Sequence, residues 1–458
     1  MGAGVGARLT DSAQYAHLWG TPELLALFDD DARLQSWLDI LAALATAQAR
    51  LGIIPVDAAD EIHRYAHADL LDMDYVAEQT RLTAHSTLGL IRAWQRILPD
   101  SAREHVYRGA TVQDVTDTWF GLVMRAVGRV AWRDLRVIED SLLDMAAEHR
   151  DTVMAGRTHG QPGAPITFGF KVASWADEVR RHIARLAEGR SRWVVGQLGG
   201  AVGVLGFFAP HGLALRAEFC RELGLGDPGM SWLTARDRIA EFGGVLALIC
   251  GTLARIGDEV YELQRPEIGE LREPTTPDTV GSITMPHKRN PEGSEHLDTL
   301  ARLVRTYAAV LYEGMVGTHE RDGRSWKAEW VALPETCLLT GVALRQAQTL
   351  LGGLIVDAGA MRDNLARFGD QLASEHVLAA LTPRLGKHQA QQLMHELLAP
   401  GRGEVQDVVG TLITAGVVAE ADRAALSGGW AIGDAPAMVD AVVARGRTAR
   451  ASEPEVWM

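Results

Sequence analysis

Cysteine is scarce in this chain of 458 residues, which contains only Cys220, Cys250 and Cys337. The number is odd and no CxxC spacing occurs, so neither a disulfide framework nor a zinc site is expected. No P-loop, HExxH or EF-hand spacing occurs, and the Gly196–Gly203 run lacks the preceding strand of a dinucleotide site. We therefore expect no metal and no cofactor.

Positive charge is also in deficit. The 45 Lys and Arg against 59 Asp and Glu give a formal net charge of −14, which argues against a nucleic-acid partner. No run of about 18 apolar residues suggests a membrane span, and the start MGAGVGARLT lacks a charged segment followed by an apolar run. The small number of cysteines predicts a cytoplasmic protein. The negative charge and the lack of long apolar runs predict no nucleic-acid partner and no membrane partner.

Strand signals are scarce too, since alternating β-branched runs bounded by turns hardly occur. Apolar residues at Trp119, Val123 and Val130 follow steps of three and four, which predict one helix over 112–150. A helix of about 35 residues is roughly 50 Å long and needs partners along its length. Four long stretches contain no proline, and they lie between Pro99 and Pro162, Pro165 and Pro210, Pro228 and Pro266, and Pro291 and Pro334.

The predicted fold is an all-α chain in three parts. Residues 1–108 form an N-terminal helical domain, which includes a helix over about 32–51. Residues 109–353 form a central long-helix bundle, and residues 354–458 form a C-terminal helical cap with breaks at Pro400-Gly401 and Gly428-Gly429. Residues 243–262 are apolar nearly all round, which predicts a helix buried in a bundle or in a subunit interface.

The loop GSITMPHKRN, Gly281 to Asn290, is the strongest candidate for chemistry. It carries the hydroxyl of Ser282, the cation of Lys288 and the amide of Asn290 between restrictive prolines. Such a loop suits a lid that closes on an anionic substrate. The alternative is an ordinary surface loop.

Two further segments carry polar groups at element boundaries. GATVQD, Gly109 to Asp114, precedes the longest helix. Its polar groups either bind an anion, or Thr111 or Asp114 caps the helix. GRTHGQP, Gly156 to Pro162, places His159 in a Gly/Pro-bounded loop between two helical stretches. A histidine can act as an acid near neutral pH, although a lone loop histidine is more often a surface residue.

Taken together, the three segments resemble the signature regions of the fumarase/aspartase superfamily, whose loop reads GSSxMPxKxNP. MPHKRNP looks most like the adenylosuccinate lyase and carboxymuconate cycloisomerase branch. The resemblance implies a homotetramer in which the active sites are shared between subunits. It also implies that Ser282 is the catalytic base, His159 the proton donor and Glu295 the residue that orients His159. The implied substrate-binding residues are Thr111, Gln113, Thr158, Lys288, Asn290, His85, Arg321, Arg324 and Ser325.

Departures from the branch patterns narrow the substrate. Thr83–Thr87 resembles the TRHDV motif of adenylosuccinate lyases, but Ala84 and Ser86 replace its Arg and Asp. An AMP-bearing substrate is therefore disfavoured. His319–Glu335 resembles carboxymuconate cycloisomerases, yet bacterial cycloisomerases usually carry Trp where this chain has His159.

The combination favours a lyase that cleaves a C–N bond of a small substituted succinate, a dicarboxylate, and releases fumarate. Nitrosuccinate lyases are one example. Ser282 would remove a proton next to a carboxylate and give an aci-carboxylate that preformed donors stabilise. The alternatives left open are carboxymuconate cycloisomerisation, adenylosuccinate cleavage and an inactive relative with a structural or binding role.

Overall fold

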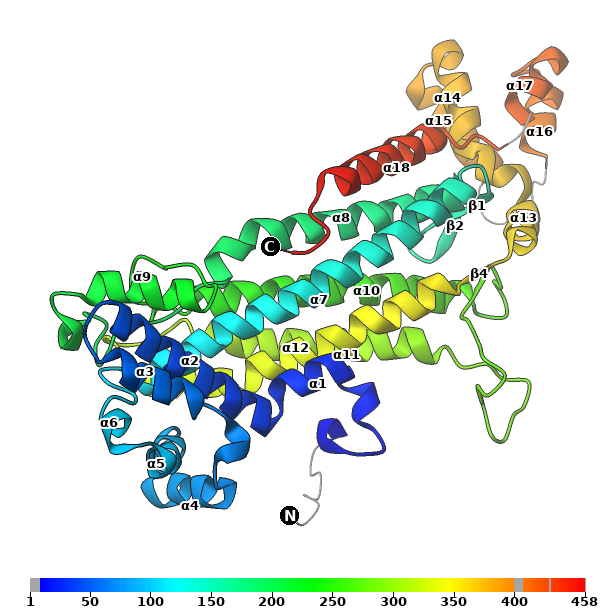
Figure 1. The fold of residues 1–458 in the computed structure, drawn as a ribbon. Coiled ribbons are helices and arrows are strands. Elements are labelled where there is room, and N and C mark those ends of the chain that lie inside the picture. The colour runs from blue at the N-terminus through cyan, green and yellow to red at the C-terminus, as the bar shows by residue number, and fades with distance from the viewer. Residues whose placement is uncertain (1–8, 399–406, 428–429, 458) are drawn as a thin grey trace.

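The computed structural model describes residues 9–398, 407–427 and 430–457. Helices account for 68% of the structure, so the expected all-α class is confirmed (Figure 1). The predicted breaks at Pro400-Gly401 and Gly428-Gly429 lie outside the described residues, as does most of the N-terminal decapeptide.

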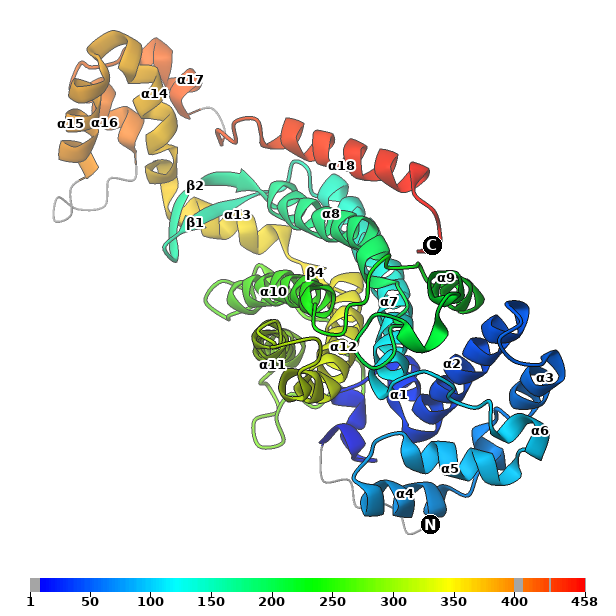
Figure 2. The ribbon, with the colours of Figure 1, turned by 90° about the vertical axis from the view of Figure 1, so that its left-hand side faces the viewer.

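The centre of the molecule is a bundle of long helices that pack side by side (Figures 1 and 2). The helix predicted over 112–150 is α7, and Val123, Val130 and Ile138 on its apolar face are buried. The bundle helices are α7 (Val112–Glu148), α8 (Phe168–Trp193), α10 (Asp237–Leu263), α11 (Glu292–Glu313) and α12 (Gly323–Gly352).

Helix α10 is the most apolar member of the bundle. In the described part of the chain it is the single helix long and apolar enough to cross a membrane, but 72% of its most apolar stretch is buried within the protomer. A Cβ on Gly243 would lie 2.4 Å from the Leu311 side chain of α11. This close approach gives a physical reason for glycine at the α10–α11 contact.

The N-terminal region runs along the bundle, with α3 to α6 gathered at one end and α1 packed against α12 nearer its middle (Figure 1). The helix predicted over about 32–51 is α2, which begins two residues earlier because Asp29 accepts a hydrogen bond from Ala32 N and caps it. The helices of this region are α1 (Pro22–Phe28), α2 (Asp30–Arg50), α3 (Val56–Arg64), α4 (Met73–Thr83), α5 (Leu88–Ile97) and α6 (Asp100–Arg103), with 3₁₀ turns at Leu9–Asp11, Ala16–Leu18 and Ala68–Leu70.

The expectation of a loop around His159 is wrong, because this segment is a β-hairpin. Strands β1 (Val153–Thr158) and β2 (Gln161–Thr167) pair antiparallel, and His159 and Gly160 form the turn with φ of 53° and 75°. Positive φ at both positions is the requirement of a two-residue type I′ turn. The prolines of β2 suggested a break, but a two-stranded hairpin has only edge strands, where proline is tolerated.

A second strand pair lies at the root of the 281–290 loop. Strand β3 (Leu271–Arg272) pairs antiparallel with β4 (Ile355–Val356), which follows α12. No helix or strand occurs between β3 and α11, as the prolines of that stretch predict.

Helix α9 (Gly212–Glu222) lies toward the opposite end of the bundle from the β3–β4 pair (Figure 1).

The last helix returns to the central bundle. Helix α18 lies along α8 and α7, and Arg150 donates to both carboxylate oxygens of Asp440 at 2.8 and 2.9 Å. The division at residues 108 and 353 stays a prediction, and α18 joins the third part to the second. The helices after β4 are α13 (Ala358–Arg367), α14 (Ser374–Leu385), α15 (Lys387–Leu398), α16 (Val408–Thr414), α17 (Arg423–Ser427) and α18 (Ala435–Ser452), with 3₁₀ turns at Gly369–Ala373 and Glu420–Asp422.

Candidate active site

The start of α7 combines a helix cap with a polar cluster. Asp114 accepts a hydrogen bond from Thr111 N at 3.0 Å, which caps the helix from its first turn. The Thr111 hydroxyl accepts a hydrogen bond from Arg321 Nη2 at 2.5 Å. The segment therefore caps α7, and the binding of an anion by Thr111 stays a prediction.

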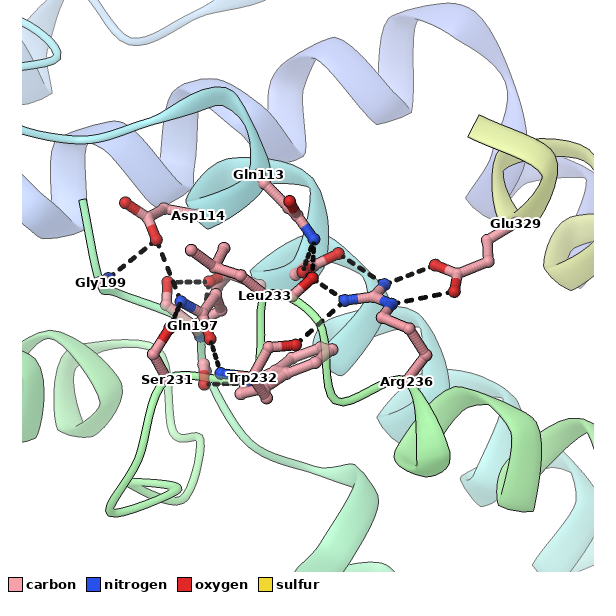
Figure 3. Close-up of polar contacts among 12 residues, drawn as sticks. Gln113, Asp114, Gln197, Gly199, Ser231, Trp232, Leu233, Arg236 and Glu329 are labelled. Carbon is pink, nitrogen blue, oxygen red and sulfur yellow. Dashed lines mark hydrogen bonds and ion pairs between the residues drawn. The ribbon is translucent and has the colours of Figure 1, made fainter. Parts of the chain in front are cut away.

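Asp114 connects α7 to the glycine-rich segment 196–203. Its buried carboxylate also accepts hydrogen bonds from Gln197 Nε2 at 3.2 Å, Gly199 N at 2.8 Å and Gly200 N at 3.0 Å (Figure 3). Burial raises the pKa of Asp114 to about 6, and the hydrogen bonds partly oppose that increase. Sequence reasoning treated Asp114 only as a cap, because its partners lie more than 80 residues away.

Gln113 points into a second buried network. Its amide donates to Asp117 Oδ2 at 3.0 Å and to Leu233 O at 2.6 Å. Arg236, which binds both Asp117 and Glu329, completes the network (Figure 3). Gln113 is fully buried and does not line the neighbouring cavity, so its predicted contact with substrate stays a prediction.

A cavity of about 330 Å³ opens beside Thr111. Its lining comes from two glycine-containing segments within 109–111 and 199–207, and it includes the apolar residues Val202, Val204 and Phe207. The lining residues are Gly109, Ala110, Thr111, Gly199, Gly200, Ala201, Val202, Val204, Gly206 and Phe207.

Three other predicted substrate-binding residues, which do not line this cavity, differ in their exposure and hydrogen bonds. Arg324 is held by Asp322, to whose Oδ1 its Nε donates at 3.0 Å, and this pairing holds the pKa of the Asp322 carboxyl below its usual range. Ser325 is half-buried in the first turn of α12. His85 lies in the exposed turn after α4, where its Nδ1 accepts from Leu88 N at 3.2 Å.

Tyr107 is a neighbour of this cluster that sequence reasoning missed. Burial and the nearby Asp114 carboxylate raise the pKa of Tyr107 to about 12, although a hydrogen bond with Thr87 and the charge of Arg321 oppose the increase. The phenol therefore stays protonated near neutral pH. No motif pointed to Tyr107, because its contacts join three separate segments.

The 281–290 loop turns back on itself near its base. Ser282 Oγ accepts a hydrogen bond from Met285 N at 3.0 Å, and Lys288 N donates to Met285 O at 2.9 Å. Asn290 Nδ2 donates to Glu292 Oε1 at 3.2 Å. Lys288 is exposed, whereas Ser282 is half-buried.

His159 and Thr158 lie exposed at the hairpin tip, and Glu295 lies exposed in the first turns of α11. Among the described residues, the Glu295 carboxylate has no hydrogen bond or ion pair, and it does not contact His159 within the protomer. The expected hydrogen bond between Glu295 and His159 therefore stays a prediction, because a single chain does not bring the two side chains together.

The candidate segments lie at opposite ends of the bundle (Figure 1). Thr111 begins α7 and the His159 hairpin follows its other end, and 37 residues of helix span about 55 Å. Ser282 precedes α11 and Arg321 follows it, so the 22 residues of α11, about 33 Å, lie between them. One protomer therefore does not bring the Thr111–Arg321 cluster close to Ser282.

In residues 9–398, 407–427 and 430–457, no group of three or more His, Cys, Asp or Glu is arranged to hold a metal.

The Asp114 network predicts that KM rises at acid pH, which gives an acid limb in the pH profile of substrate binding. Below pH 6, protonation of Asp114 would weaken the hydrogen bonds that its carboxylate accepts from N–H groups. We therefore expect KM to rise about tenfold between pH 7 and pH 5. The pKa in the folded state lies above the unfolded value of 3.8. Asp114 therefore favours folding more as the pH falls from 6 to 4, and thermal stability should not fall because of this group.

Steady-state kinetics and thermal unfolding across this pH range test that expectation. Asp114→Asn imitates the protonated state, so it should have a raised KM at pH 7 and lack the acid limb assigned to Asp114. An unchanged KM in the variant would remove Asp114 from this role.

Comparison with known proteins places these observations in a wider context. A family model described as Lyase matches residues 19–305. N-acetyl-S-(2-succino)cysteine lyase of Dickeya dadantii is 38% identical over 442 residues, which cover 95% of this chain and 97% of that protein. Nitrosuccinate lyase of Streptomyces davaonensis is 39% identical and covers 82% of this chain and 81% of its own. The 3-carboxy-cis,cis-muconate lactonizing enzyme of Pseudomonas putida has a similar solved structure, with a TM-score of 0.86, 33% identity and coverage of 94% of this chain and 98% of that one.

Proposed function

The chain belongs to the fumarase/aspartase superfamily of lyases, and from that premise we propose that it eliminates a substituent from a small 2-substituted succinate to release fumarate. We favour sulfur as the departing atom. The relative that covers 95% of the chain is named for a C–S substrate, N-acetyl-S-(2-succino)cysteine. A C–N substrate is the second candidate, which the nitrosuccinate lyase relative favours.

The observation that carries the proposal is the cavity beside the Thr111–Arg321 pair. A guanidinium that donates to a hydroxyl at 2.5 Å offers further N–H donors to a substrate carboxylate. The Val202, Val204 and Phe207 side chains offer an apolar wall to a thioether. The volume of about 330 Å³ lies within the range of ligand pockets. An AMP-bearing substrate stays disfavoured because Ala84 and Ser86 replace the Arg and Asp of the adenylosuccinate lyase motif.

The proposed reaction begins at Ser282. Its oxygen, as an oxyanion, takes the proton from the carbon next to one carboxylate, and Lys288 and Asn290 stabilise the aci-carboxylate that forms. The C–S bond then breaks, its electron pair goes to sulfur, and His159 supplies the proton to the thiolate. The Met285 N–H that donates to Ser282 Oγ favours the anionic form of that oxygen.

An assay of fumarate release separates the candidates. The purified protein would be given N-acetyl-S-(2-succino)cysteine, nitrosuccinate, adenylosuccinate and 3-carboxy-cis,cis-muconate, and fumarate would be followed by ultraviolet absorbance. We expect the highest kcat/KM for the thioether, with a Ser282→Ala sample as the control for contaminating lyases.

Each outcome has a defined meaning. Faster release from nitrosuccinate would replace the C–S proposal with the C–N alternative. Loss of carboxymuconate without fumarate would support a cycloisomerase. Faster cleavage of adenylosuccinate would contradict the argument against an AMP-bearing substrate that rests on Ala84 and Ser86. Failure with all four substrates would overturn the proposal as stated and favour a relative without this activity.

A further inference from the structure

The candidate lid is the segment 274–291 that contains the 281–290 loop, and its two roots meet at one carboxylate. Glu273 lies directly before the lid, and its side chain accepts hydrogen bonds from Gly293 N at 3.0 Å, Ser294 N at 2.8 Å and Ser294 Oγ at 2.5 Å. These donors belong to the first turn of α11, directly after the lid. A carboxylate at a helix N-terminus is favoured by the free N–H groups and by the helix dipole.

Glu273 is itself held from the bundle side. Its backbone N–H donates to Gln264 Oε1 at 2.9 Å, at the end of α10. Three residues earlier, the buried Glu270 accepts from Arg157 at 2.6 and 2.9 Å and from Asn364 Nδ2 at 2.8 Å. The segment 270–273 is therefore fixed to α10, to α13 and to the hairpin that carries His159.

We propose that Glu273 is a positioning residue for the elimination, because it ties the two roots of the lid together and to the bundle. This inference rests on the proposed function only for its effect on turnover. Ser282, Lys288 and Asn290 lie within the lid, between the two roots that Glu273 joins. Glu295 lies directly after Ser294. Glu273 does not need to touch the substrate, because it sets where these side chains lie when the lid closes.

The physical reason lies in the length of the lid. Closing a segment of 18 residues without helix or strand has an entropic cost, and hydrogen bonds to a charged acceptor are stronger than neutral ones. If the tie is lost, both roots can separate, and the lid samples more conformations in which Ser282 is misplaced. The N-terminus of α11, and Glu295 with it, would fray in the same event.

Limited proteolysis tests the tie without any substrate. The exposed Lys288 and Arg289 are trypsin sites within the lid. Glu273→Gln keeps the shape of the side chain but turns an NH₂ group toward N–H donors. We expect cleavage after Lys288 and Arg289, mapped by mass spectrometry, to become about tenfold faster. Ser294→Ala removes one of the three donors and should cause a smaller increase.

Glu267→Gln is the matched control. Glu267 is an exposed carboxylate near the same connection, and its ion pair with Arg265 is long at 3.8 Å. This variant should leave the rate of lid cleavage unchanged. The thermal midpoint of each variant should stay close to that of the parent, which separates local opening of the lid from global unfolding.

Kinetics then test positioning. Glu273→Gln should lower kcat by about 10- to 100-fold with a much smaller change in KM, because misplaced reacting groups affect turnover most. Unchanged lid cleavage in Glu273→Gln would overturn the proposal, and so would faster cleavage with unchanged kcat. The unaltered protein could also release no fumarate from any substrate while Glu273→Gln still speeds trypsin cleavage of the lid. That result would support the structural role of Glu273 and overturn the proposed function.

Discussion

Ser282→Ala is expected to lower kcat for fumarate release by about 10³- to 10⁴-fold, the upper part of the range for removal of a positioned general base. The reason is that Ser282 is the proposed base, and its loss leaves the lid without that hydroxyl. Within the part of the chain that the structure describes, the one hydrogen bond of Ser282 Oγ is the bond that it accepts from Met285 N inside the lid. We therefore expect the free energy of unfolding to change by less than about 0.5 kcal/mol, as for most surface substitutions that remove no core contact.

Measurement of kcat and of the thermal midpoint on the same preparation checks this expectation. Thr284→Ala is a matched control, because it removes an exposed hydroxyl two residues away in the same loop. The control should retain nearly full activity. If Ser282→Ala keeps more than about a tenth of the parent kcat, its loss is below the range for a general base, and another residue removes the proton.

The sequence predicted the long helices well because their signal is local. The α7 periodicity places buried side chains at Val123, Val130 and Ile138, and the start of the helix coincides with the GATVQD segment. The end at Glu148 falls two residues short of the prediction. Helix α10 was recognised from an apolar surface nearly all round, although its first turns, which begin at Asp237, were missed.

The hairpin was missed because its signal is weak in a single sequence. Pro162 and Pro165 suggest a loop, and a His-Gly turn is less distinctive than Asn-Gly. The Asp114 and Arg236 networks were missed for a different reason. Each joins residues that are far apart in the chain, and no local pattern tells a buried carboxylate in such a network from an ordinary helix cap.

The separation of the candidate segments leads to the second large expected effect. Thr111 and Arg321 lie at one end of α11 and Ser282 lies at the other, with about 33 Å of helix between them. A small 2-substituted succinate is too short to reach both ends. If both ends act on one substrate, they must come from different protomers, and the complete site exists only in an oligomer.

Mixed oligomers test this directly. The Ser282→Ala variant and a Thr111→Ala/Arg321→Ala double variant should each retain little activity. Co-expression with two affinity tags and purification of the mixed assembly should restore activity to about a quarter of the parent value, because random assembly leaves about one site in four with both intact ends. Fumarate release and size-exclusion chromatography would be measured on each sample.

The matched control uses two variants of the same lid. Ser282→Ala mixed with Asn290→Ala should show no recovery, because every lid in the mixed oligomer carries one defect. Recovery in this control would mean that the two lid residues serve different sites. If the first mixture is no more active than the sum of its separate components, both ends do not contribute to one shared site. The Thr111–Arg321 cavity would then have to act without the Ser282 lid, and the elimination mechanism proposed for this chain would lose either its substrate-binding pair or its base.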